Sequence, residues 1–131
     1  MKLIDITLLD QLTTQAQENP RLRMNYNLHE SLDSKAQRLL NALEPGTFLP
    51  IHRHQNTSET YILLRGKLSV LFYNEKGELT ETSILDHSSE NFGVHISAGQ
   101  WHTIEVLESG TVIFEVKEGP YKPLTNEDML K

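Results

Sequence analysis

The chain has 131 residues, a length that supports one domain with one hydrophobic core. Its formal net charge is -6, and its Lys and Arg residues are dispersed along the sequence. This charge pattern excludes a typical nucleic-acid-binding protein, because phosphate recognition needs clustered cations.

Cysteine is absent from the chain. This absence excludes disulfides and thiolate ligands, so imidazole and carboxylate groups are left to hold any metal ion. No apolar stretch approaches the roughly 18 residues that suggest a membrane-spanning helix, and no signal peptide is recognisable. We therefore expect a soluble cytoplasmic protein that does not interact with a membrane.

Residues 1–19 predict an amphipathic helix. The apolar positions follow helical spacing: Leu8, Leu9, Leu12 and Ala16. Asp5 or Thr7 is a suitable residue to cap the first turn, and the Asn19-Pro20 step ends the helix. We expect this helix to pack on the outside of a β-sheet domain as part of the scaffold.

Residues 21–29 alternate between apolar and polar side chains, which predicts a strand. The apolar face consists of Leu22, Met24, Tyr26 and Leu28, and the polar face of Arg21, Arg23, Asn25, Asn27 and His29. The polar face fits a wet outer surface, and it fits the mouth of a pocket equally well. In the second case Arg23, Asn25, Asn27 and His29 would bind a hydroxyl-rich or anionic substrate.

Residues 36–43 are apolar enough for either a short helix or a buried strand, and periodicity does not separate the two. Further strands are predicted at 47–54, 60–64, 68–73, 79–85, 92–96, from 102 onward and at 111–116. One helical turn near the end has Thr125 as its cap and Asp128 three residues later. About eight short strands predict an all-β sandwich or barrel with a short terminal helix.

The stretch from Gly46 to Gly66 carries the metal-binding chemistry. His52 and His54 are two residues apart, so in a strand they project from the same face. Glu59 opens the next strand and can return a carboxylate toward them. Two imidazoles and a carboxylate form half of a coordination shell for a divalent metal of borderline softness.

This spacing resembles the first motif of the cupin family. Five residues separate Gly46 from His52, one separates His52 from His54, four separate His54 from Glu59, and six separate Glu59 from Gly66. The turn Gly99-Gln100-Trp101-His102 resembles the core of the second cupin motif, which supplies one more histidine. Ser97, Asn91 and Val106 stand where that motif has Pro, Gly and Asn.

The cupin resemblance implies a double-stranded β-helix, or jelly-roll barrel. It implies a single cupin domain over 1–131, with a helical segment at 1–19, the barrel at 21–116 and a tail at 117–131. The implied metal ligands are His52, His54, Glu59 and His102. This set leaves one or two open positions and does not choose among Fe, Mn, Ni and Zn. Glu59 is also a candidate catalytic base, and a metal-free cupin pocket is the alternative.

A closer resemblance, to the WbuC family of cupin-fold metalloproteins, covers almost the whole chain. It rests on residues 23–29, the turn 44–46, the His52-Arg53-His54 pair and the turn 99–102. Members of that family are associated with bacterial O-antigen and other surface-polysaccharide gene clusters. The resemblance therefore implies a metal-binding cupin that works near sugar metabolism.

Three functions agree with these features. The first is a metal-dependent isomerase, epimerase or lyase for a sugar or sugar-nucleotide in O-antigen biosynthesis, with the metal as Lewis acid. The second is a non-catalytic cupin that binds or senses a sugar or a small acid, and the third is an Fe(II) dioxygenase. Because cupins commonly pair through their sheets, a homodimer is also expected.

Overall fold

The computed structural model describes residues 1–130; Lys131, the last residue of the predicted tail, lies outside the described residues. The described part contains one α-helix, eight strands and two short 3-10 helices. In order they are α1 (Ile6–Glu18), β1 (Arg23–Asn27), β2 (Ala36–Leu43), β3 (Glu59–Arg65), β4 (Lys67–Tyr73), β5 (Leu79–Asp86), η1 (His87–Ser89), β6 (Gly93–Ile96), β7 (Trp101–Val106), β8 (Thr111–Glu118) and η2 (Asn126–Asp128).

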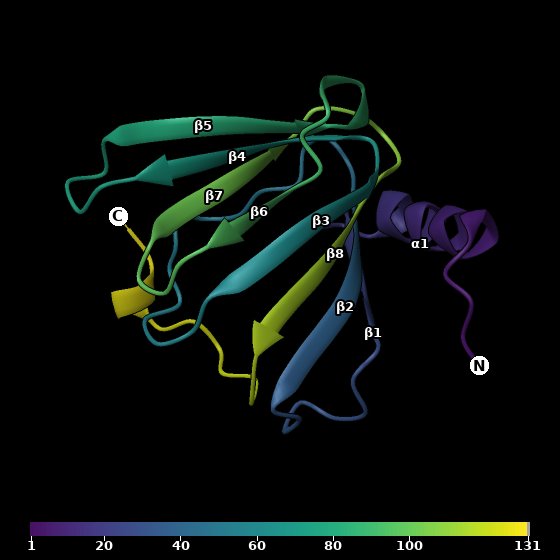
Figure 1. The fold of residues 1–131 in the computed structure, drawn as a ribbon, viewed down its shortest axis with the longest axis horizontal. Helices are drawn as coiled ribbons and strands as arrows, with labels where there is room; N and C mark the ends of the chain where they lie inside the picture. Colours follow the sequence, from purple (N-terminus) through teal and green to yellow (C-terminus); the bar gives the residue numbers. More distant parts are fainter. Residues whose placement is uncertain (131) are drawn as a thin grey trace.

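The strands form two antiparallel sheets that face each other (Figure 1). The five-stranded sheet has the order β1-β2-β8-β3-β6, and the three-stranded sheet has the order β5-β4-β7. The core between them contains Leu43, Leu63, Leu68, Val70, Leu85, Ile96, Ile104, Val106 and Ile113. This architecture confirms the predicted all-β, jelly-roll cupin fold with one short terminal helix.

Helix α1 covers the outer face of the five-stranded sheet (Figure 1). The Asp5 carboxylate accepts a hydrogen bond of 3.0 Å from the Leu8 N–H, so Asp5 rather than Thr7 caps the helix. The contact between helix and sheet consists of Leu9, Leu12, Ala16, Leu40, Ala42 and Val112. Because this contact is apolar, it agrees with the predicted role of the helix as part of the scaffold.

Residues 36–43, for which helix and strand were both open, form β2. Leu40 and Ala42 pack toward α1, whereas Leu43 packs into the core between the sheets. Both faces of β2 carry buried apolar residues, so its sequence does not alternate regularly between apolar and polar side chains, which explains why periodicity did not identify it.

The predicted strand at 47–54 is wrong. In this segment His52 alone makes β-bridges, to His102 and to Met129. The His52 N–H donates to the His102 carbonyl at 3.0 Å, and the His102 N–H donates back at 2.8 Å. Pro50 has no N–H to donate, so a continuous ladder does not form beside it. The bridge to His102 nevertheless fixes His52 next to β7.

The ends of the chain depart only slightly from expectation. Strand β8 continues to Glu118, past the predicted barrel boundary at 116. The predicted turn near the C-terminus is η2, where the backbone N–H and the hydroxyl of Thr125 both donate to Asp128 Oδ2 at 3.0 Å. Over residues 1–130, no helix has both the length and the apolar character needed to cross a membrane.

Candidate metal centre

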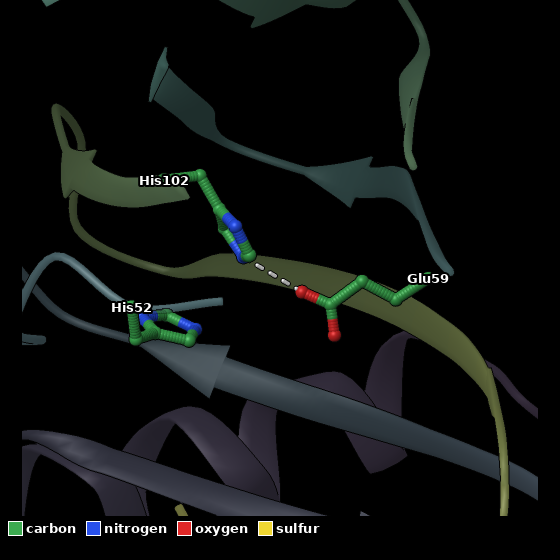
Figure 2. A group of neighbouring side chains, drawn as sticks. All are labelled: His52, Glu59 and His102. Carbon is green, nitrogen blue, oxygen red and sulfur yellow. Dashed lines mark hydrogen bonds and ion pairs between the residues drawn. The ribbon is translucent and has the colours of Figure 1, made fainter. Parts of the chain in front are cut away.

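Three of the four predicted ligands form one buried group between the two sheets. Glu59 is the first residue of β3, His102 is the second residue of β7, and His52 lies in the segment bridged to β7. One ligand atom from each residue lies within 4.8 Å of the others. Figure 2 shows Glu59 and His102 pointing toward each other from different strands, with the His52 ring beside them.

Backbone carbonyl groups orient the two buried imidazoles. His52 Nδ1 lies 2.8 Å from the Pro50 carbonyl oxygen, and His102 Nδ1 lies 2.8 Å from the Gln100 carbonyl oxygen. A carbonyl only accepts hydrogen bonds, so each Nδ1 carries the proton and each Nε2 is left for another partner. Metal-binding histidines are commonly held in this way by a carbonyl or carboxylate.

Glu59 is 3 % exposed and supplies the carboxylate of the group. Its Oε1 accepts a hydrogen bond of 2.6 Å from the Tyr61 hydroxyl and lies 2.9 Å from His102 Nε2. Burial by itself would raise the pKa of Glu59, but the hydrogen bond from His102 and the nearby His54 and Tyr61 lower it below its usual value. The carboxylate is therefore charged at neutral pH, as a metal ligand must be.

His54 lies at the edge of the group. Its Nε2 is 3.4 Å from Glu59 Oε2, its side chain is 20 % exposed, and its ring centroid lies 5.6 Å from that of His52 and 6.4 Å from that of His102. Burial lowers the pKa of His54. The charge of Glu59 raises it by a smaller amount and that of Lys117 lowers it, so the pKa stays below its usual value. His54 thus contacts the carboxylate of the three-residue group and presents a neutral ring to it.

The chemistry of these donors fits a divalent metal. His102 Nδ1 donates to a carbonyl oxygen, so its Nε2 has a lone pair that faces the Glu59 carboxylate. A lone pair and a carboxylate that face each other suit a cation. Burial, together with the nearby His102, lowers the pKa of His52 to about 4, so its imidazole is neutral at pH 7 and available as a ligand.

The predicted substrate-binding stripe lies on the same face of the sheet as Glu59 but away from it. Met24 and Tyr26 pack toward α1, so the alternate residues Arg23, Asn25 and Asn27 project from the inner face. Strands β2 and β8 lie between β1 and β3, so this stripe is separated from Glu59 by two strands.

The individual members of the stripe have local partners. Arg23 Nη1 donates to the Phe48 carbonyl at 3.0 Å. Asn25 and Asn27 are exposed. His29 lies beyond the strand, and its Nδ1 is 3.0 Å from the Arg38 carbonyl oxygen and accepts the Arg38 N–H at 3.1 Å. His29 is therefore held by the backbone of β2.

Sequence reasoning missed two polar residues of the inner face. Tyr61 follows Glu59 by two residues, so strand alternation could have indicated their contact. Glu115 lies opposite Tyr61 in the register of β3 and β8, and it accepts a hydrogen bond of 2.9 Å from Asn41. Burial and the charge of Glu59 raise the pKa of Glu115 to about 7. The available signal for Glu115 was an acid directly after the apolar run Val112, Ile113 and Phe114.

Comparison with solved structures identifies the same fold in several proteins. CapF from Staphylococcus aureus, described as a capsular polysaccharide assembling protein, is 21% identical with a TM-score of 0.59, over 76% of this chain and 27% of that one. KdgF from Halomonas sp. is 12% identical with a TM-score of 0.60, over 79% of this chain and 84% of that one. A cupin-2 domain containing protein from Shewanella frigidimarina is 19% identical with a TM-score of 0.56, over 73% and 80%.

These likenesses establish the cupin fold, and the chain spans only about a quarter of the CapF chain. No curated protein matches the sequence. A family model described as a domain of unknown function, DUF6016, matches residues 4–85. This match covers the helix, strands β1 to β4, all of β5 except Asp86, and two of the three residues of the buried group. The chain therefore belongs to the DUF6016 family and has a cupin fold.

Proposed function

We propose that this protein binds one divalent transition metal, Fe, Mn, Ni or Zn, through His52, His54, Glu59 and His102. The observation that supports the proposal most is the buried group of His52, Glu59 and His102. Its imidazoles are oriented by carbonyl groups, and its carboxylate is charged. His54 completes the set from the edge, 3.4 Å from Glu59.

We further propose that the metal centre acts on a sugar or sugar-nucleotide in the synthesis of a bacterial surface polysaccharide, as an isomerase, epimerase or lyase. The resemblance to the WbuC family supports this role, and CapF, a protein of the same fold, is described as assembling capsular polysaccharide. A metal bound here would supply a Lewis acid that polarises a ligand oxygen. Arg23, Asn25, Asn27 and His29 remain the proposed groups for binding the rest of the substrate.

Two carboxyl groups have different parts in this proposal. Glu59, with its lowered pKa and its hydrogen bonds from Tyr61 and His102, suits a permanent ligand better than the catalytic base. Glu115 is partly exposed, and its pKa of about 7 is close to neutral pH. A group with such a pKa can accept and return a proton at neutral pH.

Metal content and turnover together test this function. We expect about one equivalent of one metal in untagged protein grown in minimal medium, measured by elemental mass spectrometry, and its loss in His102→Ala. Turnover of activated hexoses by the metal-loaded protein, absent in a folded His52→Ala variant, would support the enzyme. A wild-type protein that binds none of the four metals would overturn the metal centre.

The same assays separate the alternatives. Saturable sugar or small-acid binding without product, in metal-loaded protein, would identify a non-catalytic binding or sensing cupin. Oxygen consumption that depends on Fe(II) and substrate would identify a dioxygenase. Light scattering should give twice the monomer mass, because we propose a homodimer by analogy with cupins that pair through their sheets.

A further inference from the structure

A pocket with a volume of about 180 Å³ lies against His54. Its walls are the loop 53–57 and the C-terminal segment 117–124, with Asp128. At about 30 Å³ for each water, the volume holds roughly six waters, or the acidic group and first carbons of a small molecule. His54 lines this pocket and also lies 3.4 Å from Glu59, so the pocket borders the candidate metal centre.

Three cationic side chains line the pocket: Arg53, Lys117 and Lys122. Across residues 1–130, none of them has a carboxylate oxygen within 4.0 Å. The Arg53 guanidinium stacks on the Trp101 ring at 4.4 Å, and Lys117 Nζ lies 5.9 Å from the Tyr121 ring centroid. Arg53 Nε is buried and has no hydrogen-bond partner among the described residues. Arg53 Nε thus lacks the acceptor that a buried N–H normally finds, and the two lysines have no carboxylate partner among the described residues.

The two carboxylates of the pocket, Glu118 and Asp128, form no ion pair with these cations among the described residues. Asp128 Oδ1 accepts a hydrogen bond of 2.7 Å from Gln55 Nε2, and its Oδ2 accepts from the N–H and hydroxyl of Thr125. Glu118 is exposed. Three cations against two carboxylates give the pocket a formal charge of +1, although the whole chain carries -6.

Lys117 connects the pocket to the candidate metal centre. It lies directly opposite Glu59 in the register of β3 and β8, so both side chains project from the inner face. Three neutral imidazoles and one carboxylate would leave a bound divalent metal with a formal charge of +1, and Lys117 adds another positive charge beside it. An anion that reaches both groups would balance this excess.

We propose that the pocket binds the anionic group, a carboxylate or a phosphate, of the small molecule that reaches the metal centre. Lys117 and Lys122 bind that group, and Arg53 supplies an N–H donor. The inference rests on the proposed function for the identity of the rest of the ligand. It narrows the proposed substrate from any sugar or sugar-nucleotide to a sugar that carries a carboxylate or a phosphate.

Matched pairs of ligands test this inference by calorimetry on metal-free and metal-loaded protein. D-galacturonate is compared with D-galactose, D-glucose 6-phosphate with D-glucose, and inorganic phosphate serves as the bare anion. The comparison of the first two pairs shows whether a carboxylate or a phosphate is preferred. Fluorescence of Trp101, the single tryptophan of the chain and the residue beneath Arg53, gives an independent signal.

We expect at least one charged sugar to bind about tenfold tighter than its neutral parent, the factor that a single charge-assisted hydrogen bond supplies. Lys117→Met and Lys122→Met should each weaken that binding about tenfold, with metal content and unfolding temperature unchanged. Lys76→Met is the matched control, because Lys76 lies in the β4–β5 hairpin and does not line the pocket. Lys117→Gln repeats the test if the methionine variant is unstable.

Other results would overturn either the anion pocket or the proposed function. Equal binding of charged and neutral sugars, binding of no anion at all, or undiminished binding in both lysine variants would overturn the anion pocket. Any of these with normal metal content would leave the metal centre standing. Anion binding by a wild-type protein that takes up no metal would leave the pocket standing and remove the proposed function.

Discussion

The candidate metal centre and the pocket beside it lie at the same end of the barrel, yet their polar groups differ in how many hydrogen-bond and ion-pair partners they have. In the metal centre, Glu59 receives two partners and each buried imidazole is oriented by a carbonyl oxygen. In the pocket, Lys117 and Lys122 have no carboxylate within 4.0 Å among residues 1–130. The polar groups of the first region are paired with one another, whereas the second region has cations without a carboxylate partner and one buried N–H, Arg53 Nε, without a hydrogen-bond partner among the described residues.

The largest difference between the two regions should appear when their charges are removed. Glu59→Gln removes the negative charge from the three-residue group, so we expect metal affinity to fall about 100-fold or more. Lys117→Met removes a positive charge from the pocket side and should not lower metal affinity. Competition with a chromophoric chelator measures both values. Similar losses in the two variants would show that the regions are not separate.

Glu115 lies opposite Tyr61 on the inner face, and its effect on stability should depend on pH. Its pKa is raised to about 7, so it stabilises the fold below its unfolded pKa, and that stability is lost as the pH rises through 7. Glu115→Gln is neutral at every pH. We expect the variant to gain, relative to wild type, about 2 kcal/mol more at pH 8 than at pH 5, a value reduced for partial exposure of the carboxyl group.

Urea unfolding of metal-free protein at the two pH values measures this difference. His52 acts in the opposite direction in both proteins, because its lowered pKa costs stability as the pH falls from 6.5 toward 4. Comparing the variant with wild type cancels that contribution. An equal change at pH 5 and pH 8 would contradict the raised pKa of Glu115.

Tyr61 should contribute to the metal centre through Glu59 alone. Tyr61→Phe removes the hydroxyl that donates to Glu59 Oε1 at 2.6 Å and keeps the buried ring. We expect metal affinity to fall about tenfold, as is usual for groups that orient a ligand. The chelator assay measures it, and a loss as large as that of Glu59→Gln would mean that Tyr61 does more than orient the carboxylate.

The smallest effect is expected at Arg53, on the pocket side. Its contact with Trp101 is a cation–π interaction at 4.4 Å, and it has no ion pair among the described residues. Arg53→Met should therefore lower the free energy of unfolding by about 0.5 kcal/mol. Urea unfolding at neutral pH measures this. A loss of several kcal/mol would indicate that Arg53 is a structural residue and weaken its role as an anion donor.

The histidine positions show how far spacing alone could lead. The sequence predicted that His52 and His54 project together from a strand, and the structure places both near Glu59 without that strand. An isolated β-bridge to His102, instead of a continuous strand pairing, positions His52. Motif spacing thus selected residues that the fold brings together, whereas the local conformation depended on a partner 50 residues away in the chain.

The polar stripe of β1 shows the opposite case. Alternation predicted which residues share a face, and it left open whether that face is inside or outside. The packing of Met24 and Tyr26 toward α1 decided it, because the helix occupies one side of the sheet and forces the stripe to the other. Periodicity contains no information on which side of a sheet a distant helix will cover.

The sequence by itself determined the strand-rich fold, the helix at its start and the residue types available to a metal, because periodicity, turn residues and ligand spacing are local properties. Only the tertiary structure decided that β2 is a strand, that Glu115 faces Tyr61 and that Lys117 lies opposite Glu59. These relations depend on the register between strands that are far apart in the chain. Register is set by the packing of the whole barrel.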